Sequence, residues 1–125
     1  MNAATPHRLM VVDDSNIIRR RIERAQDLPG IESIASARNG REALALQQQF
    51  KPTIVTMDLT MPEMDGAECV ERLVAIDPNV RILVISALAD KLTAIDAIEK
   101  GACGFLCKPF TDRQLNEALR KVLEA

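Results

Sequence analysis

The chain has 125 residues, enough for one domain of ordinary size, and 47% of them are hydrophobic. A net charge of −2, no Trp, no Tyr and three Phe argue against direct binding of nucleic acid, which favours basic surfaces and aromatic stacking. No apolar run approaches the roughly 20 residues of a membrane span, and Met1–Pro6 lack the apolar segment of a signal peptide. Three cysteines without a Cys-x-x-Cys pair favour a reducing cytoplasm over a disulfide framework or zinc site.

Short apolar runs alternate with apolar residues at helical spacing along the whole chain. In chain order, strands are expected at Leu9–Val12, Ile31–Ala37, Ile54–Met57, Arg81–Ile85 and Gly104–Cys107. Each is followed by a predicted helix, whose apolar residues are Ile18, Ile22 and Ala25; Ala43, Leu46 and Phe50; Val70, Leu73 and Val74; Leu92, Ile95 and Ile98; and Leu115, Ala118, Leu119 and Val122. Gly101 fits a helix C-terminus, and the segment from Thr111 to Gln114 fits a capping box at the start of the last helix.

Five strand–helix units predict an α/β fold with a five-stranded parallel sheet and helices on both faces. Right-handed crossovers and one reversal of strand order give a doubly wound, flavodoxin-like (βα)5 arrangement with strand order 2-1-3-4-5. We expect one domain over residues 1–125. In such sheets the ligand crevice lies beyond the carboxyl ends of the strands, between strands 1 and 3.

Acidic residues follow both strands at that crevice: Asp13 and Asp14 after the first, and Asp58 after the third. Three neighbouring carboxylates repel one another unless a cation is present, and Mg²⁺ prefers such oxygen ligands. The alternative is that Asp13 and Asp14 merely cap the following helix. The pairing with Asp58 favours a metal site.

The remaining polar groups at the strand ends suggest phosphoryl chemistry. An Asp58 oxygen can attack phosphorus to form an acyl phosphate, although a turn-forming role is the alternative. Lys108 can pair with Asp58 or with a phosphoryl oxygen, and Pro109 favours an extended or cis-linked Lys108. Ser86 can donate to a phosphoryl oxygen or simply cap a helix. Core packing is expected for Phe105.

The arginines Arg19, Arg20 and Arg21 lie in the first predicted helix. We expect them to form a solvated face, which is the usual position of a charged run.

Four segments together resemble the receiver domain of two-component response regulators, above all the stand-alone CheY-like receivers of chemotaxis. They are Val11–Asp14, Met57–Gly66, Ile85–Ala87 and Cys107–Phe110. The resemblance covers almost the entire chain, and the combination of motifs is highly specific.

The resemblance implies that Asp58 accepts a phosphoryl group from a sensor histidine kinase. Asp14, Asp58 and the backbone carbonyl of Thr60 would bind Mg²⁺ directly, and Asp13 through water. Lys108 would contact the phosphoryl group. Such a protein is no enzyme beyond its own phosphorylation and dephosphorylation.

Ser86 and Phe105 would act as the switch, with Ser86 moving toward the phosphoryl group and Phe105 rotating inward. The resemblance places the readout surface on the fourth helix, fifth strand and fifth helix, where a downstream protein or dimer mate would dock. This surface would include Lys91, Ala94, Ile98, Phe105 and the face near Thr111.

Three positions differ from the pattern of the chemotaxis receivers. This chain has Thr60 where those receivers have Asn, Leu88 where they have an acidic residue, and Phe105 where they have Tyr. A bulky Leu88 should hinder the attacking water, so we expect a long-lived phosphoryl state. Because Phe105 lacks the Tyr hydroxyl, a partner that recognises this hydroxyl is not expected to bind in the same way, and binding to a flagellar motor does not follow from the resemblance.

Other functions remain as alternatives. A receiver cut from a larger regulator with a DNA-binding or enzymatic output is one, although a chain from Met1 to Ala125 without a linker favours a stand-alone protein. A Mg²⁺-dependent phosphohydrolase is a remote one, because Thr60 occupies the position of its acid/base Asp. A flavin-binding module is disfavoured because Asp13 and Asp14 would repel the flavin phosphate.

Overall fold

The computed structural model describes residues 6–59, 66–87 and 91–124, and the expectations for Thr60 and Leu88 lie outside these residues. The strands are β1 (His7–Val12), β2 (Ile31–Ala37), β3 (Ile54–Asp58), β4 (Arg81–Ala87) and β5 (Gly104–Lys108). The helices are α1 (Asn16–Ala25), α2 (Gly40–Phe50), α3 (Gly66–Ile76), α4 (Lys91–Glu99) and α5 (Asp112–Glu124). Within the described residues, no helix has the length and apolar character needed to cross a membrane.

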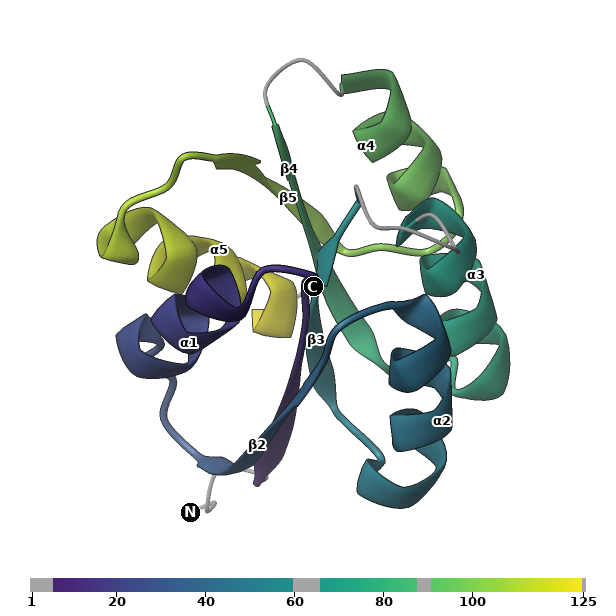
Figure 1. Cartoon of the computed structure of the whole chain (residues 1–125), viewed down its shortest axis with the longest axis horizontal. Coiled ribbons are helices and arrows are strands. Elements are labelled where there is room, and N and C mark those ends of the chain that lie inside the picture. Colours follow the sequence, from purple (N-terminus) through teal and green to yellow (C-terminus); the bar gives the residue numbers. More distant parts are fainter. Residues whose placement is uncertain (1–5, 60–65, 88–90, 125) are drawn as a thin grey trace.

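The five strands form one parallel sheet in the order β2-β1-β3-β4-β5. Helices α1 and α5 cover one face of the sheet, and α2, α3 and α4 cover the other (Figure 1). The predicted flavodoxin-like fold and its strand order are therefore confirmed.

Each face of the sheet has its own hydrophobic core. Ile22, Leu115 and Leu119 pack with one set of strand residues beneath α1 and α5. Val70 and Leu73 belong to the second cluster, beneath α2, α3 and α4. All five residues of β3 are buried because the strand has neighbours on both sides and helices on both faces. This buried central strand carries Asp58 at its end.

Local hydrogen bonds define where several helices begin. The Ser15 hydroxyl caps α1 by accepting from the Ile18 N–H at 3.2 Å. The capping box before α5 is confirmed: the Thr111 N–H donates to Gln114 Oε1 at 2.9 Å, and the Gln114 N–H donates to Thr111 Oγ1 at 3.1 Å. These caps fix the starts of the two helices that lie beside the candidate site.

Helix α4 is oriented differently from the sequence expectation. Leu92 and Ile95 have exposed fractions of 84% and 55%, whereas Ala94 and Ala97 are buried against the core. The small alanines allow α4 to approach the sheet closely, so the larger apolar residues of its helical pattern point outward. The expectation that Ala94 belongs to an exposed surface is wrong.

Candidate functional site

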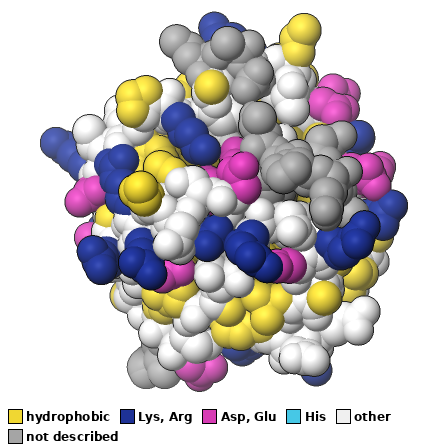
Figure 2. Space-filling model, viewed as in Figure 1, with side chains coloured by type: hydrophobic (Ala, Val, Ile, Leu, Met, Phe, Trp, Pro, Cys, Tyr) yellow, Lys and Arg dark blue, Asp and Glu magenta, His cyan; other side chains and the backbone are white. Residues whose placement is uncertain are grey.

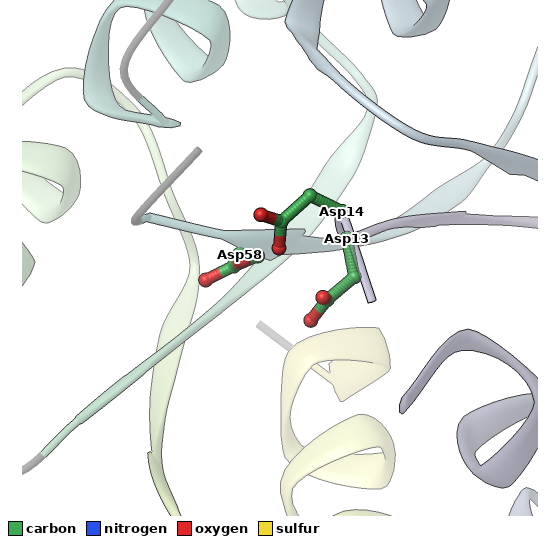
Figure 3. Close-up of side chains that lie close together, drawn as sticks. All are labelled: Asp13, Asp14 and Asp58. Atoms are coloured by element: carbon green, nitrogen blue, oxygen red, sulfur yellow. The ribbon is translucent and has the colours of Figure 1, made fainter. Parts of the chain in front are cut away.

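Three carboxylates gather at the carboxyl end of the sheet. Asp13 and Asp14 directly follow β1, and Asp58 is the last residue of β3, which pairs with β1 through Val12 and Met57. One carboxylate oxygen from each residue lies within 4.8 Å of the other two. The close-up shows the three side chains near one another (Figure 3). The structure thus brings together the three acids that the sequence singled out.

The burial of the three acids differs. Asp13 and Asp58 have exposed fractions of 1% and 3%, whereas Asp14 is exposed. Two buried carboxylates and one that faces solvent form an open oxygen donor set, which suits a hard cation that keeps part of its water shell. The residues present therefore fit Mg²⁺.

Asp13 is held in place by its own backbone environment. Its Oδ1 accepts from the Ser15 N–H at 2.8 Å. Since Ser15 is the cap of α1, the alternative that Asp13 and Asp14 serve as that helix cap is wrong. The hydrogen bond fixes the Asp13 carboxylate and leaves Oδ2 directed toward the other charged groups of the site.

Lys108 supplies the positive charge of the site. Its Nζ lies 3.3 Å from Asp13 Oδ2 and 3.4 Å from Asp58 Oδ1. The following Lys108–Pro109 peptide bond is cis. Burial lowers the pKa of the Lys108 ammonium, but the negative charges of Asp58 and Asp13 outweigh it, so this pKa lies above its ordinary value. Lys108 is therefore a cation at neutral pH.

Ser86 and Phe105 lie on the neighbouring strands β4 and β5. Asp58 pairs with Ile85, so the buried Ser86 stands one residue further along β4. Its hydroxyl donates to the Ala87 carbonyl at 3.3 Å. Phe105 is half-buried and packs against the core beneath α2, α3 and α4. Their assignment as switch residues stays a prediction.

Arg19 is a site residue that the sequence analysis missed. It is buried, and its Nη1 donates to the Asp13 carbonyl at 2.7 Å while its Nη2 donates to Asn16 Oδ1 at 3.1 Å. The expectation of a solvated face is wrong for this arginine. Arg19 lies three residues before the apolar Ile22 and therefore on the same face of the helix, which could have indicated from the sequence that this arginine is buried.

Comparison with known proteins agrees with this fold. Residues 9–120 match the family model described as the response regulator receiver domain. The chain is 42% identical over 115 residues to a chemotaxis protein CheY of Thermotoga maritima, covering 92% of this chain and 96% of that protein.

Two further matches cover different shares of the related protein. The chain is 39% identical to a protein-glutamate methylesterase/protein-glutamine glutaminase of Carboxydothermus hydrogenoformans, covering 94% of this chain but 33% of that protein. In the CheX–CheY–BeF3–Mg complex from Borrelia burgdorferi, the matching chain has a TM-score of 0.82 and 31% identity, with 96% of this chain and 89% of that chain covered. The protein belongs to the response regulator receiver domain family.

Proposed function

We propose that this receiver domain is a phosphorylation-activated switch in which Asp58 accepts a phosphoryl group from a sensor histidine kinase. The observation that carries this proposal is the position of Asp58. It is buried, its carboxylate is grouped with those of Asp13 and Asp14, and it is ion-paired with Lys108. A buried nucleophile beside an acidic cluster and a lysine suits phosphoryl transfer.

In the proposed reaction, an Asp58 carboxylate oxygen forms a bond to phosphorus while the bond from phosphorus to the donor's imidazole nitrogen breaks. The imidazole leaves as the neutral ring after taking up a proton. The Lys108 ammonium, now beside Asp58 Oδ1, turns to the incoming phosphoryl oxygens and neutralises part of their charge. Bound Mg²⁺, held by Asp14, Asp58 and the Thr60 carbonyl with Asp13 through water, would add further charge neutralisation.

The signal would be read on α4, β5 and α5. Ser86 and Phe105 would respond to the new dianion, because a local charge change can bias a two-state surface. The exposed apolar residues Leu92, Ile95 and Ile98 on α4 offer a contact area for a protein partner or a dimer mate.

We further propose that the protein acts in the cytoplasm as a single domain in chemotaxis-type signalling and has no separate enzymatic activity. The match to CheY along almost its full length supports this view. The match to part of a methylesterase supports the alternative, a receiver joined to an enzymatic output.

Intact mass after incubation with acetyl phosphate tests the proposal. The wild type should gain one phosphoryl group only when Mg²⁺ is present, and Asp58→Ala should gain none because the attacking carboxylate is gone. Glu71→Gln, which changes an exposed acid on α3, is the matched control and should behave as wild type.

The same experiment gives the lifetime of the phosphoryl group. Slow decay after removal of acetyl phosphate is expected from Leu88, and Leu88→Glu should accelerate it. Wild type that gains no mass from acetyl phosphate or from a cognate kinase would contradict the proposed function.

A further inference from the structure

Arg21 contacts the segment between β5 and α5 in three ways. Its guanidinium carbon lies 4.5 Å from the centre of the Phe110 ring, and its Nη2 donates a hydrogen bond to the Phe110 carbonyl. The same Nη2 lies 3.5 Å from Asp112 Oδ1. One side chain of α1 therefore binds the ring, the backbone and the first helical residue of a segment that begins immediately after Lys108.

This segment is short and anchored at Phe110. Phe110 has an exposed fraction of 4% and belongs to the core beneath α1 and α5. Only Pro109 separates Phe110 from Lys108, so a shift of Phe110 would also displace the Lys108 backbone. Since Lys108 Nζ must lie between Asp13 and Asp58, the position of Phe110 affects the charge geometry of the phosphorylation site.

The neighbouring arginines do not share these contacts. Figure 2 shows several Lys and Arg side chains on the left of the view, where α1 and α5 lie in Figure 1. Among the described residues, Arg20 is exposed and makes none of the contacts to Phe110, and Arg120 pairs with Asp27 at 2.8 Å. Arg21 alone among these three bridges α1 to the segment that follows Lys108.

We propose that Arg21 is a positioning residue that holds Lys108 in reach of the phosphoryl group by fixing Phe110. This inference rests on the proposed function. In the test reaction, an Asp58 oxygen forms a bond to phosphorus as the bond from phosphorus to the acetyl oxygen breaks, and acetate leaves as the anion. Lys108 contributes charge only, so its misplacement slows the transfer without changing the products.

The test compares Arg21→Met with wild type. Methionine keeps an apolar stem against Phe110 but loses the hydrogen bond, the ion pair and the stacked cation. We expect phosphorylation by acetyl phosphate at saturating Mg²⁺ to slow about five- to twentyfold, because small misplacements of catalytic groups have large effects. The affinity for the phosphoryl analogue beryllium trifluoride, measured by calorimetry, should fall in parallel.

Two readouts separate positioning from general destabilisation. Mg²⁺ affinity should not fall below that of wild type, because neither Arg21 nor Lys108 is a proposed metal ligand and a displaced Lys108 competes less with the cation for Asp13 and Asp58. Arg21→Lys should recover part of the rate, since an ammonium can still donate to the Phe110 carbonyl but cannot stack and pair as a guanidinium does.

Two control variants complete the series. Arg20→Met changes an adjacent exposed arginine, and Arg120→Met breaks an ion pair between α5 and the chain following α1. Both should phosphorylate as wild type. If Arg120→Met slowed the reaction as much as Arg21→Met, loosening of these helices would explain the effect and the inference would be wrong.

A double-mutant cycle with Lys108→Ala tests whether Arg21 acts through Lys108. If Arg21 acts through Lys108, Arg21→Met should weaken analogue binding in wild type but have no further effect once Lys108 is removed. An equal effect in both backgrounds would overturn the inference, as would an Arg21→Met protein that reacts like Arg20→Met. A wild type that neither reacts nor binds the analogue would instead refute the proposed function.

Discussion

At the scale of single residues, Gly66 shows how closely the backbone packs beside Asp58, the proposed phosphoacceptor. A Cβ at this position would lie 2.5 Å from Leu59 Cα and 2.6 Å from the Asp58 carbonyl oxygen. Both neighbours are backbone atoms, which cannot move aside as a flexible side chain can. Gly66 therefore allows α3 to begin directly against the end of β3.

We expect Gly66→Ala to lower the free energy of unfolding by about 1–3 kcal/mol, a typical cost of overpacking. It should also slow phosphorylation, because the backbone of Asp58 must shift. Urea denaturation and intact mass measure the two effects. Gly104→Ala is the comparison: its nearest neighbour is a Val122 side-chain carbon at 2.9 Å, so we expect a smaller loss of stability and little change in phosphorylation. Equal stability of Gly66→Ala and wild type would contradict this account.

At the scale of elements, α4 is held to the sheet by its small residues. Ala97 has an exposed fraction of 0%, whereas Ile95 is 55% exposed. An apolar residue that remains in contact with water adds little to folding stability, while substitution of a buried residue by a larger one disturbs close packing. The outward stripe of Leu92, Ile95 and Ile98 is thus available for binding rather than needed for the core.

Two substitutions in α4 test this orientation by urea denaturation. Ile95→Gln should change the free energy of unfolding by less than about 0.5 kcal/mol, as surface substitutions usually do. Ala97→Leu should lower the free energy of unfolding by about 1–3 kcal/mol, because the buried Ala97 site has no space for a larger side chain. A large loss from Ile95→Gln would show that this face of α4 is covered in solution.

At the scale of the whole molecule, we expect the acidic cluster of Asp13, Asp14 and Asp58 to lower folding stability. Three carboxylates share one end of the sheet with Lys108 as the cation that pairs with two of them. Their mutual repulsion is relieved on unfolding, so we expect the site to destabilise the fold when no metal is bound. Sites arranged for function often carry such a cost.

Asp58→Asn should therefore stabilise the metal-free protein, by about 0.5–2 kcal/mol. Mg²⁺ should stabilise the wild type by about 2.7 kcal/mol at a concentration 100 times its Kd, and should stabilise Asp58→Asn less. Thermal unfolding with EDTA or with Mg²⁺ measures both differences. A metal-free Asp58→Asn protein less stable than wild type would indicate that the ion pair of Asp58 with Lys108 outweighs the repulsion.

Much of the fold could be predicted from the sequence alone. Buried parallel strands are mostly apolar along their length, so β1 and β4 were visible as uninterrupted apolar runs and β3 as a run interrupted only by Thr56. Polar residues at the ends of such runs must lie at one edge of the sheet, which identified Asp13, Asp14, Asp58 and Lys108 as neighbours. The limits of β2 are as predicted, and the other four strands extend one or two residues beyond their predicted limits, since pairing with the neighbouring strand decides where a strand ends; β4, for example, continues through Ser86.

The sequence by itself determined the sheet, its strand order and the acidic cluster, because these depend on apolar runs and on which residues end them. Only the tertiary structure decided the orientation of α4 and the different environments of Arg19, Arg20 and Arg21. One arginine is buried beneath Asp13, one is exposed, and one lies over Phe110. Successive helical residues point about 100° apart, and their surroundings depend on distant segments that local sequence patterns do not specify.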